Sequence, residues 1–369
     1  MRSTMWRPRR RSRMMGGSAL IVVTGMFLAA CGSSGSGGSS KPVGDDFKGE
    51  TLTVINYGGT WEEAWNKAIT KRFEEKYNAK VVTVEATGTQ LLSKMIAQRN
   101  SPQIDVWMGN AKDGEELIKD DLVQTLDPAK IPNMANVYPQ YRRQGDGYVY
   151  VDVGPVGIVY NTDKIKTPPT SYQDLFNPAY KGHVVMPSTE TCCSYYFPII
   201  ESYLNGGNLD NMEPGWKALE KLKPNVLTFT GWQQLVSLMS SGQGWIAFAG
   251  TDRIGTAIKD GAHLKVVLPE EGNLPIPDVT GITKGSKHQR LAELYVNQVL
   301  DAQSQQEFTD WATLAPVVNN AHATPENLPF LGTPEYAAKT AKEMPMDWAT
   351  VTKLQSDWLD RFQKTIGAS

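Results

Sequence analysis

Residues 148–182 read YVYVDVGPVGIVYNTDKIKTPPTSYQDLFNPAYKG, and they decide how the rest of the chain is arranged. Residues 149–160 are rich in valine, isoleucine and tyrosine, which favour a strand, but Gly154, Pro155 and Gly157 interrupt the run. We therefore predict two short extended segments joined at a kink, rather than one long strand. In the middle of a chain, such a segment is typical of a crossing between two lobes. A bent edge strand within one domain is the alternative, and these residues alone leave both open.

The first thirty residues have the features of a secretory signal peptide. Six arginines precede an apolar run at residues 19–28, and small residues then lead to Cys31. The apolar run is shorter than the roughly 20 residues that a membrane-spanning helix needs. Residues 28–31, Leu-Ala-Ala-Cys, resemble the bacterial lipobox, so we predict that Cys31 becomes the lipidated first residue of the mature chain. An ordinary signal peptide with a chance cysteine is the alternative.

Residues 32–40 contain only glycine and serine, a composition that forms a flexible coil. We therefore predict a signal peptide at 1–30 and a lipidated flexible linker at 31–48. Removal of the signal peptide takes away six arginines and no acidic residue, so the formal net charge falls from −2 to −8. This negative charge argues against a nucleic-acid partner and against a polybasic membrane patch. We expect an extracytoplasmic protein that its N-terminal lipid anchors to the cell membrane.

Strands and helices alternate on both sides of residues 148–182. Predicted strands, most of them followed by a helical pattern, lie at 51–56, 80–85, 104–108, 183–186, 226–229, 245–248 and 264–268, with another at 278–283. This alternation predicts an α/β protein with parallel strands, in which ligands bind beyond the carboxyl ends of the strands. Because such blocks lie on both sides, they favour the crossing between two lobes over the edge strand.

The loop after the first strand is a candidate binding site. Tyr57, Gly58, Gly59 and Thr60 connect the strand to a helical pattern that begins at Trp61. A glycine turn at the start of a helix presents backbone N–H groups that bind anions. Such turns are also common in α/β proteins that bind nothing there, so the turn alone does not establish a site.

Taken in order, these features resemble the extracellular solute-binding proteins of ABC importers, in the branch that includes spermidine- and putrescine-binding proteins. Single motifs of the likeness are weak, but their order and spacing over the mature chain are specific. They are the lipobox, Tyr57-Gly-Gly-Thr-Trp61, Asp105-Val-Trp107, Gly157-Ile-Val-Tyr-Asn161, Gly244-Trp-Ile-Ala247, and Asp278 before a strand.

The resemblance implies an α/β fold of the type II periplasmic binding proteins. Each of two lobes is then a mixed sheet flanked by helices, and two hinge strands cross between them. Lobe 1 would hold residues 49–153 and 279–316, and lobe 2 residues 154–278 and 317–369, with the return crossing near 275–279. The resemblance also implies a monomer without a cofactor or metal, which binds a small molecule in the cleft and delivers it to the membrane subunits of an ABC permease.

The likeness to polyamine binders implies aromatic side chains against methylene groups and carboxylates against ammonium groups. Asp278 is the preferred carboxylate because it stands at the family's position before the returning strand. The expected ligand-binding residues lie mainly in loops at strand ends and are Tyr57, Gly58, Gly59, Thr60, Trp61, Gly109, Asn110, Ser188, Thr189, Glu190, Phe248, Gly250, Thr251, Asp252 and Asp278.

Two positions depart from the polyamine pattern. Ile276 and Ala315 stand where an aromatic residue is expected in polyamine binders. With fewer aromatic residues and more glycine and hydroxyl groups, the cleft suits a smaller ligand, including one with an anionic end. The sequence therefore supports a small polar solute, of which a polyamine is one example.

Cys192 and Cys193 are adjacent, which makes a vicinal disulfide possible. Neighbouring Cα atoms are about 3.8 Å apart, closer than ordinary disulfides prefer, so such a bridge is strained. An oxidising compartment favours the bridge, and two small buried thiols are the alternative.

The sequence gives little support to an enzyme. The four histidines show no metal-ligand spacing, and no Gly-x-Ser-x-Gly motif occurs. A surface lipoprotein with a hydrolase or sensor role is the alternative to a transport function.

Overall fold

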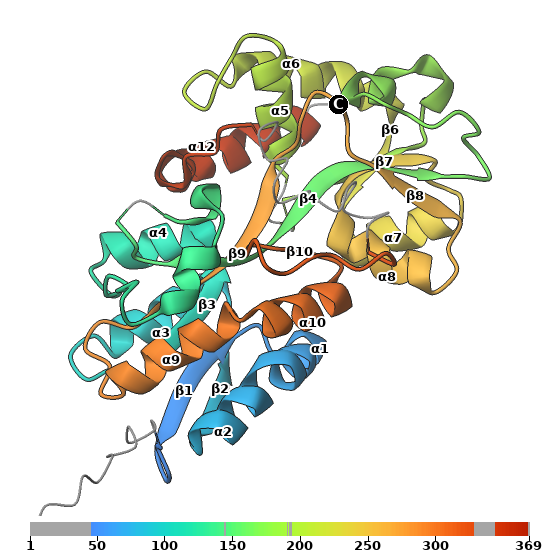
Figure 1. Cartoon of the computed structure of the whole chain (residues 1–369). Helices are drawn as coiled ribbons and strands as arrows, with labels where there is room; N and C mark the ends of the chain where they lie inside the picture. Colours follow the sequence, from blue (N-terminus) through green and yellow to red (C-terminus); the bar gives the residue numbers. More distant parts are fainter. Residues whose placement is uncertain (1–45, 144, 190, 192–193, 328–343, 368–369) are drawn as a thin grey trace, which may run out of the picture. The chain divides into compact units, whose positions relative to one another are not determined.

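The computed structural model describes residues 46–143, 145–189, 191, 194–327 and 344–367 (Figure 1). These residues belong to one compact unit, Asp45–Ser369. The predicted signal peptide, Cys31, Glu190, Cys192 and Cys193 lie outside the described residues. Within the described residues, none of the helices has the length and apolar content that a membrane span requires.

The first part of the chain forms βα units. In order, its elements are β1 (Thr51–Asn56), α1 (Gly59–Trp65), a π-helical turn (Asn66–Thr70), α2 (Lys71–Tyr77), β2 (Lys80–Glu85), α3 (Gly88–Ala97), β3 (Val106–Asn110), α4 (Ala111–Lys119), two 3-10 turns (Pro132–Asn136 and Pro139–Tyr141) and β4 (Val149–Asn161).

The second part continues this alternation. Its elements are 3-10 turns at Tyr172–Phe176, Pro178–Tyr180 and Lys223–Asn225, with β5 (Val184–Pro187), α5 (Tyr196–Leu204), α6 (Glu213–Leu222), β6 (Val226–Thr230), α7 (Trp232–Ser240), β7 (Ile246–Gly250), α8 (Thr251–Lys259), β8 (Leu264–Val267), β9 (Pro275–Ile282), α9 (Gln289–Val299), α10 (Ala302–Ala312), β10 (Ala315–Pro316) and α12 (Trp348–Gly367). The predicted strands are confirmed within a few residues, and the largest shift is the earlier start of β9.

The strands form one mixed sheet in the order β2-β1-β3-β9-β4-β7-β5-β6, with β8 and β10 also paired to β4. β1 runs parallel to β2 and β3, and β5 runs parallel to β6 and β7, as the βα alternation predicts. β9 instead runs antiparallel to both β3 and β4. Figure 1 shows β4 (green) and β9 (orange) side by side in the middle of the sheet.

The prediction of two short segments joined at a kink is wrong. Residues 149–161 form the single 13-residue strand β4, and every residue in it is buried. Up to Pro155 its partners are β9 and β10, and from Val156 onward they are β7 and β8. β4 is therefore a central strand that changes partners along its length. Its hydrogen-bonded neighbours on both sides override the low strand propensity of glycine and proline.

The glycine at position 157 is explained by a close approach and not by a bend. An ideal Cβ there would lie 2.6 Å from the carbonyl oxygen of Val267 in β8. No real side chain is tolerated at that distance from backbone, so only glycine lets β8 pack against β4 here.

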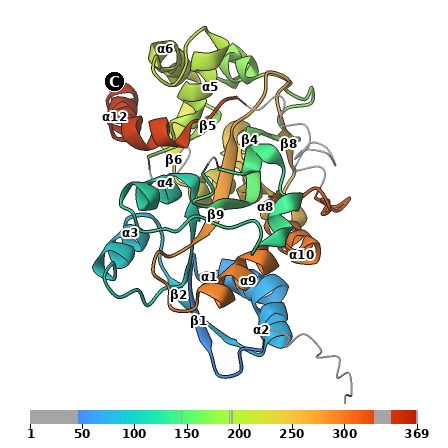
Figure 2. The ribbon, with the colours of Figure 1, turned by 60° about the vertical axis from the view of Figure 1, so that its left-hand side comes forward.

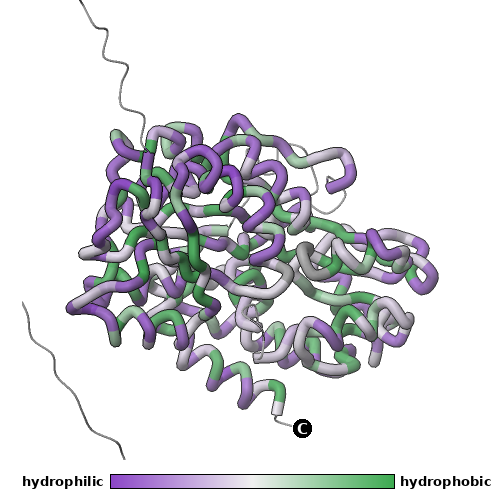
Figure 3. Tube along the Cα trace, turned by 90° about the horizontal axis from the view of Figure 1, so that it is seen from below, coloured by the Kyte–Doolittle hydropathy of each residue, from purple (hydrophilic) through white to green (hydrophobic). Residues whose placement is uncertain are grey.

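Apolar side chains from most elements form a continuous core around the sheet. In Figure 3 hydrophobic stretches run through the interior of this unit, whereas its outer helices and loops alternate between hydrophilic and hydrophobic residues. Helix α12 packs against both α4 and α6, which lie in different parts of the sequence (Figure 2). This packing brings the C-terminal helix next to the ends of the strands where ligands bind in such folds.

Replacing Gly157 by alanine should lower the free energy of unfolding by about 1–3 kcal/mol, the usual cost of overpacking. The measurement is chemical denaturation of the variant and the wild type. Gly367→Ala is the matched control, because an ideal Cβ at that position has no neighbour within 4 Å. The control should change stability by less than about 0.5 kcal/mol. Equal stability of G157A and wild type would contradict the close-approach explanation.

Candidate functional site

Three side chains that the sequence analysis selected meet at the centre of the sheet. Tyr57 follows β1, Asn110 ends β3, and Asp278 lies in β9 directly opposite Asn110 in the strand register. The Tyr57 hydroxyl donates to Oδ1 of Asp278 at 2.5 Å, and Nδ2 of Asn110 donates to the same oxygen at 2.9 Å. Nδ2 of Asn110 also lies 3.2 Å from the Tyr57 hydroxyl. We call Tyr57, Asn110 and Asp278 the carboxylate cluster.

The surroundings of Tyr57 are strongly acidic. Burial raises the pKa of its phenol well above the ordinary value, and the charges of Asp278, Asp113 and Asp152 raise it further. Tyr57 therefore remains a hydrogen-bond donor at any physiological pH. Asp152 lies opposite Asp278 in the β4–β9 register, and Asp278 itself is 8% exposed. Three carboxylates around one phenol create a negative potential that favours a cation.

Asp113 links this cluster to helix α4. Its Oδ2 accepts a hydrogen bond from the backbone N–H of Asn110 at 3.0 Å, in a capping box that opens the helix. Asp113 is only 5% exposed, and burial raises the pKa of its carboxyl. The spacing of Asn110 and Asp113 was visible in the sequence, and it is the signal that would have added Asp113 to the candidate site.

The glycine turn after β1 adopts the backbone that only glycine accepts easily, with φ of 71° at Gly58 and 57° at Gly59. The N–H of Gly58 already donates to Oδ1 of Asn56 at 2.9 Å. An ideal Cβ at Gly58 would lie 2.5 Å from the Glu85 carboxyl carbon, so the acidic side chain of Glu85 packs directly against the turn. These contacts explain the glycines structurally and do not favour an anion at this turn.

Trp61 is part of an aromatic group beside the carboxylate cluster. Its ring centroid lies 5.4 Å from that of Tyr57 and 4.8 Å from that of Phe308, both in edge-on geometry. The ring centroid of Trp311 lies 6.5 Å from that of Trp61, and Trp311 is 48% exposed. Trp61 was predicted from the sequence and Trp311 was not, because nothing in the sequence shows that α10 packs against α1.

A cavity of about 210 Å³ opens next to the carboxylate cluster. This volume equals roughly seven water molecules, which suits a small solute. Its lining residues come from separate elements and are Gly88, Asn110, Lys112, Asp113, Thr189, Thr191, Tyr195, Tyr196, Ile276, Pro277, Trp348, Gln355 and Leu359. Asn110 and Thr189 were selected from the sequence. Lys112, Tyr195, Tyr196 and the α12 residues were not selected. For the α12 residues the reason is that only the folded chain brings α12 to this cavity.

Other selected residues take structural positions. Phe248 is fully buried, with ring centroids 6.0 Å from Tyr172 and 5.7 Å from Phe197, so it is a core residue and we remove it from the ligand set. The N–H of Ser188 donates to the carbonyl of Thr230 at 2.9 Å. An ideal Cβ at Gly109 would lie 2.9 Å from Asp113 Oδ2, and Gly250 ends β7. The side chains of Thr60, Thr251 and Asp252 lie outside the described set.

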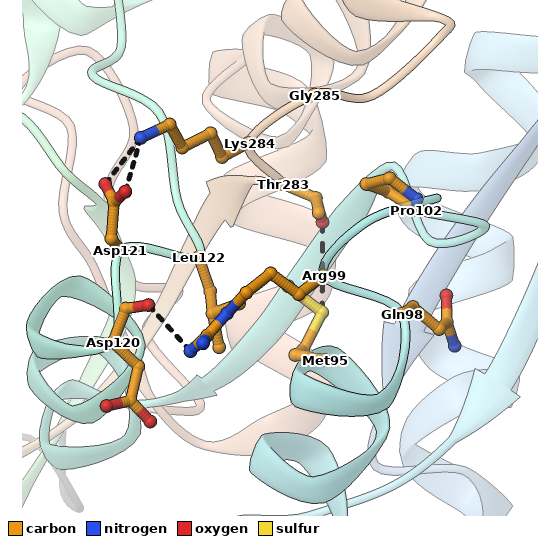
Figure 4. Close-up of a pocket in the computed structure, with 10 residues that line it drawn as sticks. All are labelled: Met95, Gln98, Arg99, Pro102, Asp120, Asp121, Leu122, Thr283, Lys284 and Gly285. Atoms are coloured by element: carbon orange, nitrogen blue, oxygen red, sulfur yellow. Dashed lines mark hydrogen bonds and ion pairs between the residues drawn. The ribbon is translucent and has the colours of Figure 1, made fainter.

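A second cavity, of about 320 Å³, lies between the end of α3 and the residues after β9 (Figure 4). Three of its charged side chains, those of Arg99, Asp121 and Lys284, have partners. Lys284 forms an ion pair with Asp121 at 2.6 Å, and Nη2 of Arg99 donates to the carbonyl of Asp120 at 3.0 Å. The carboxylate cluster is thus the better candidate site. In the part of the chain that the structure describes, no three His, Cys, Asp or Glu side chains are grouped to hold a metal ion.

Comparison with known proteins identifies the family of this chain. The family model of the bacterial extracellular solute-binding proteins matches residues 68–343, so the chain belongs to this family. The family supplies the solute-binding components of ABC importers, and the fold class predicted from the sequence is confirmed.

Two of the similar proteins are named for small amines. The chain is 23% identical over 281 residues to a gamma-aminobutyric acid-binding protein of Pseudomonas aeruginosa, covering 73% of this chain and 77% of the relative. It is 24% identical over 269 residues to spermidine/putrescine-binding periplasmic protein 1 of Haemophilus influenzae, covering 70% and 73%. The solved structure of a putative extracellular solute-binding protein from Bordetella parapertussis superposes with a TM-score of 0.76 at 23% identity, covering 86% of this chain and 99% of that one.

Asp113→Asn should stabilise the protein at neutral pH. Because burial raises the pKa of the Asp113 carboxyl, folding favours its protonated form. That favourable contribution is complete below the unfolded-state pKa of about 3.9 and is lost as the pH rises through the folded-state pKa. The excess stability of D113N should therefore be present at pH 7 and shrink toward pH 4.

Thermal unfolding of both proteins between pH 4 and pH 7 measures this difference. Asp121→Asn is the matched control, because Asp121 is exposed at the protein surface. A stability difference between D113N and wild type that stays constant over this pH range would contradict the prediction.

Proposed function

We propose that this protein captures a small solute with a primary ammonium group and delivers it to the membrane subunits of an ABC permease. The observation that carries the proposal is the carboxylate cluster, in which Tyr57 and Asn110 both donate to Oδ1 of Asp278. Asp113 and Asp152 add negative charge around Tyr57. An ammonium group that enters here gains charge-assisted hydrogen bonds in a largely buried setting.

The side chains that line the cavity beside the cluster favour a short aliphatic amine. The cavity beside the cluster is small, and Ile276, Trp348 and Leu359 give it apolar lining for methylene groups. Gamma-aminobutyric acid and putrescine, which appear in the names of the two relatives, both carry an ammonium group on a short methylene chain. The likeness to those relatives therefore supports the same end group here.

Binding would take place between two lobes, with residues 49–153 and 279–316 in lobe 1, and 154–278 and 317–369 in lobe 2. The change of strand partners between Pro155 and Val156 supports this division. β9 provides the return crossing, close to Asp278. Helix α12 contacts both α4 and α6, so it lies beside both lobes of this scheme. The proposed ligand residues on the lobe 2 side are Ser188, Thr189, Glu190, Gly250, Thr251 and Asp252.

We also propose that the protein acts as a monomer held at the cell membrane by lipid on Cys31, with residues 32–44 as a flexible leash. The linker predicted at 31–48 extends too far, because the N–H of Phe47 donates to the carbonyl of Tyr77 at 2.9 Å and Phe47 packs against the core. The support is the order of basic residues, apolar run, Leu-Ala-Ala-Cys and glycine-serine segment. The protein binds and releases its solute without chemical change in this proposal.

Cys31→Ser should release the protein from the membrane fraction. The lipid is attached through a thioether to the cysteine sulfur, and serine has no sulfur to form this bond. The measurement is cell fractionation with intact-mass determination of the wild type and the variant. The wild type should carry the mass of a lipid on its first residue. Equal membrane retention of C31S would contradict the lipid anchor.

Asp278→Asn should abolish the ligand-induced rise in unfolding temperature, since a ligand that binds only the folded state stabilises it. Loss of one partner of a buried charge pair is expected to weaken amine binding by about 30-fold or more. The ligand is identified first, by mass spectrometry of small molecules that co-purify with the protein. A thermal-shift series then compares D278N with wild type.

Asp121→Asn serves again as the control and should keep the full thermal shift, because Asp121 lines the cavity of Figure 4 and not the candidate site. Two outcomes would count against the proposal. One is an unchanged shift in D278N. The other is a wild-type protein that responds to no polyamine, amino acid or organic phosphonate.

A further inference from the structure

The cavity next to the carboxylate cluster is lined by charges of both signs. Lys112 lines it together with Asn110 and Asp113, at the start of α4. Nζ of Lys112 lies 3.7 Å from Oε1 of Glu116, beyond the 2.7–3.2 Å of a usual N–H···O hydrogen bond. The two side chains are 28% and 23% exposed, so water screens this pair and it contributes little. The ammonium group of Lys112 is therefore available to a ligand.

The positive and negative groups are held in separate directions. Asn110 and Asp113 are tied to each other by the capping box, and Asn110 is tied to Asp278 at 2.9 Å. Lys112 and Asp113 are adjacent in a helix, so their side chains leave the axis about 100° apart. The two side chains therefore leave α4 in different directions, while the positive charge of Lys112 still acts on the Asp113 carboxyl.

The cavity wall formed by the segment after β5 is neutral where it is described. Thr189, Thr191, Tyr195 and Tyr196 line the cavity there, and among the described lining residues of that wall there is no carboxylate. Hydroxyl groups donate to anions as readily as they accept from cations. This wall is therefore compatible with an anionic group held by Lys112.

A diamine and a zwitterion are expected to interact differently with the charges that line this cavity. If one ammonium group binds the carboxylate cluster, the other end of a short ligand lies in a cavity of about 210 Å³ that Lys112 also lines. A second ammonium there is repelled by the like charge of Lys112, whereas a carboxylate or phosphonate is attracted. Ile276 and Leu359 remain to contact the methylene groups between the two ends.

Resting on the proposed function, we infer that the ligand is a short zwitterion, an amino acid or aminoalkylphosphonate with its charges at opposite ends. Its ammonium group binds the carboxylate cluster, and its anionic group binds Lys112. Lys112 is then the residue that makes the site select zwitterions over diamines.

The test is isothermal titration calorimetry of the purified full chain with matched probes. The zwitterions are ω-amino acids of three to six carbons and 3-aminopropylphosphonate, and the comparison ligands are α,ω-diamines of the same lengths. The best zwitterion should bind wild type at least about tenfold more tightly than the best diamine, the usual contribution of one hydrogen bond to a charged group. Lys112→Gln should remove this preference, and Lys112→Glu should reverse it.

Lys119→Glu is the matched control, because Lys119 is exposed on the same helix and does not line the cavity. It should keep the wild-type preference. A wild type that prefers diamines would overturn the inference, as would K112E that binds the zwitterion as tightly as wild type.

The failure of this inference is distinguishable from the failure of the proposed function. If D278N loses all amine binding while K112E has no effect, only the role of Lys112 is wrong. If D278N binds as tightly as wild type, or if no probe binds wild type, both proposals are wrong.

Discussion

The candidate site depends on the antiparallel pairing of β9 with β3 on one side and β4 on the other. This pairing sets Asp278 opposite Asn110 and Asp152 at the same level of the sheet. Because side chains alternate along a strand, a slip of one residue would turn Asp278 away and present Pro277 or Val279. Backbone hydrogen bonds therefore fix the acid beside Tyr57, and the site does not rely on flexible loops to position its main charge.

The same strand pairing costs the ligand-free protein some of its folding free energy. Asp113, Asp152 and Asp278 are all less than a tenth exposed, and keeping carboxylates away from water costs free energy. Hydrogen bonds from Tyr57 and Asn110 offset part of this cost at Asp278. In the proposed function, a bound ammonium group would offset more of this cost. Ligand capture would then be coupled to the stability of the folded state.

Whether a site residue can be predicted from the sequence depends on how far apart along the chain its contacts lie. Tyr57 and Asn110 end strands of βα units, where local patterns already indicate a binding edge, and Asp278 came from the family resemblance. Phe248 was selected wrongly because both faces of β7 are buried, so the strand has no alternation that shows which side chains face the core. Helix α12 reaches the site only through tertiary packing, whereas Lys112 was passed over although it lies in the first turn of the helix that Asn110 caps. The continuity of β4 was missed because strand propensity is local and pairing is not.

Two prolines face each other at the place where β4 changes partners. Pro155 stands opposite Pro275 in the β4–β9 register, and neither residue has an N–H to donate. The next residue of β4 does donate, because the N–H of Val156 bonds to the carbonyl of Leu274 at 3.3 Å where β4 leaves β9 and joins β7 and β8. Asp278 lies three residues from this point on β9. A change in the angle between the two strands at the proline pair would move the cavity walls from β5 and α12 relative to Asp278, while the β3–β9 register that positions the charge stays intact. Such a change would leave the contacts among Tyr57, Asn110 and Asp278 in place, because they are made at the ends of β1 and β3 and on β9.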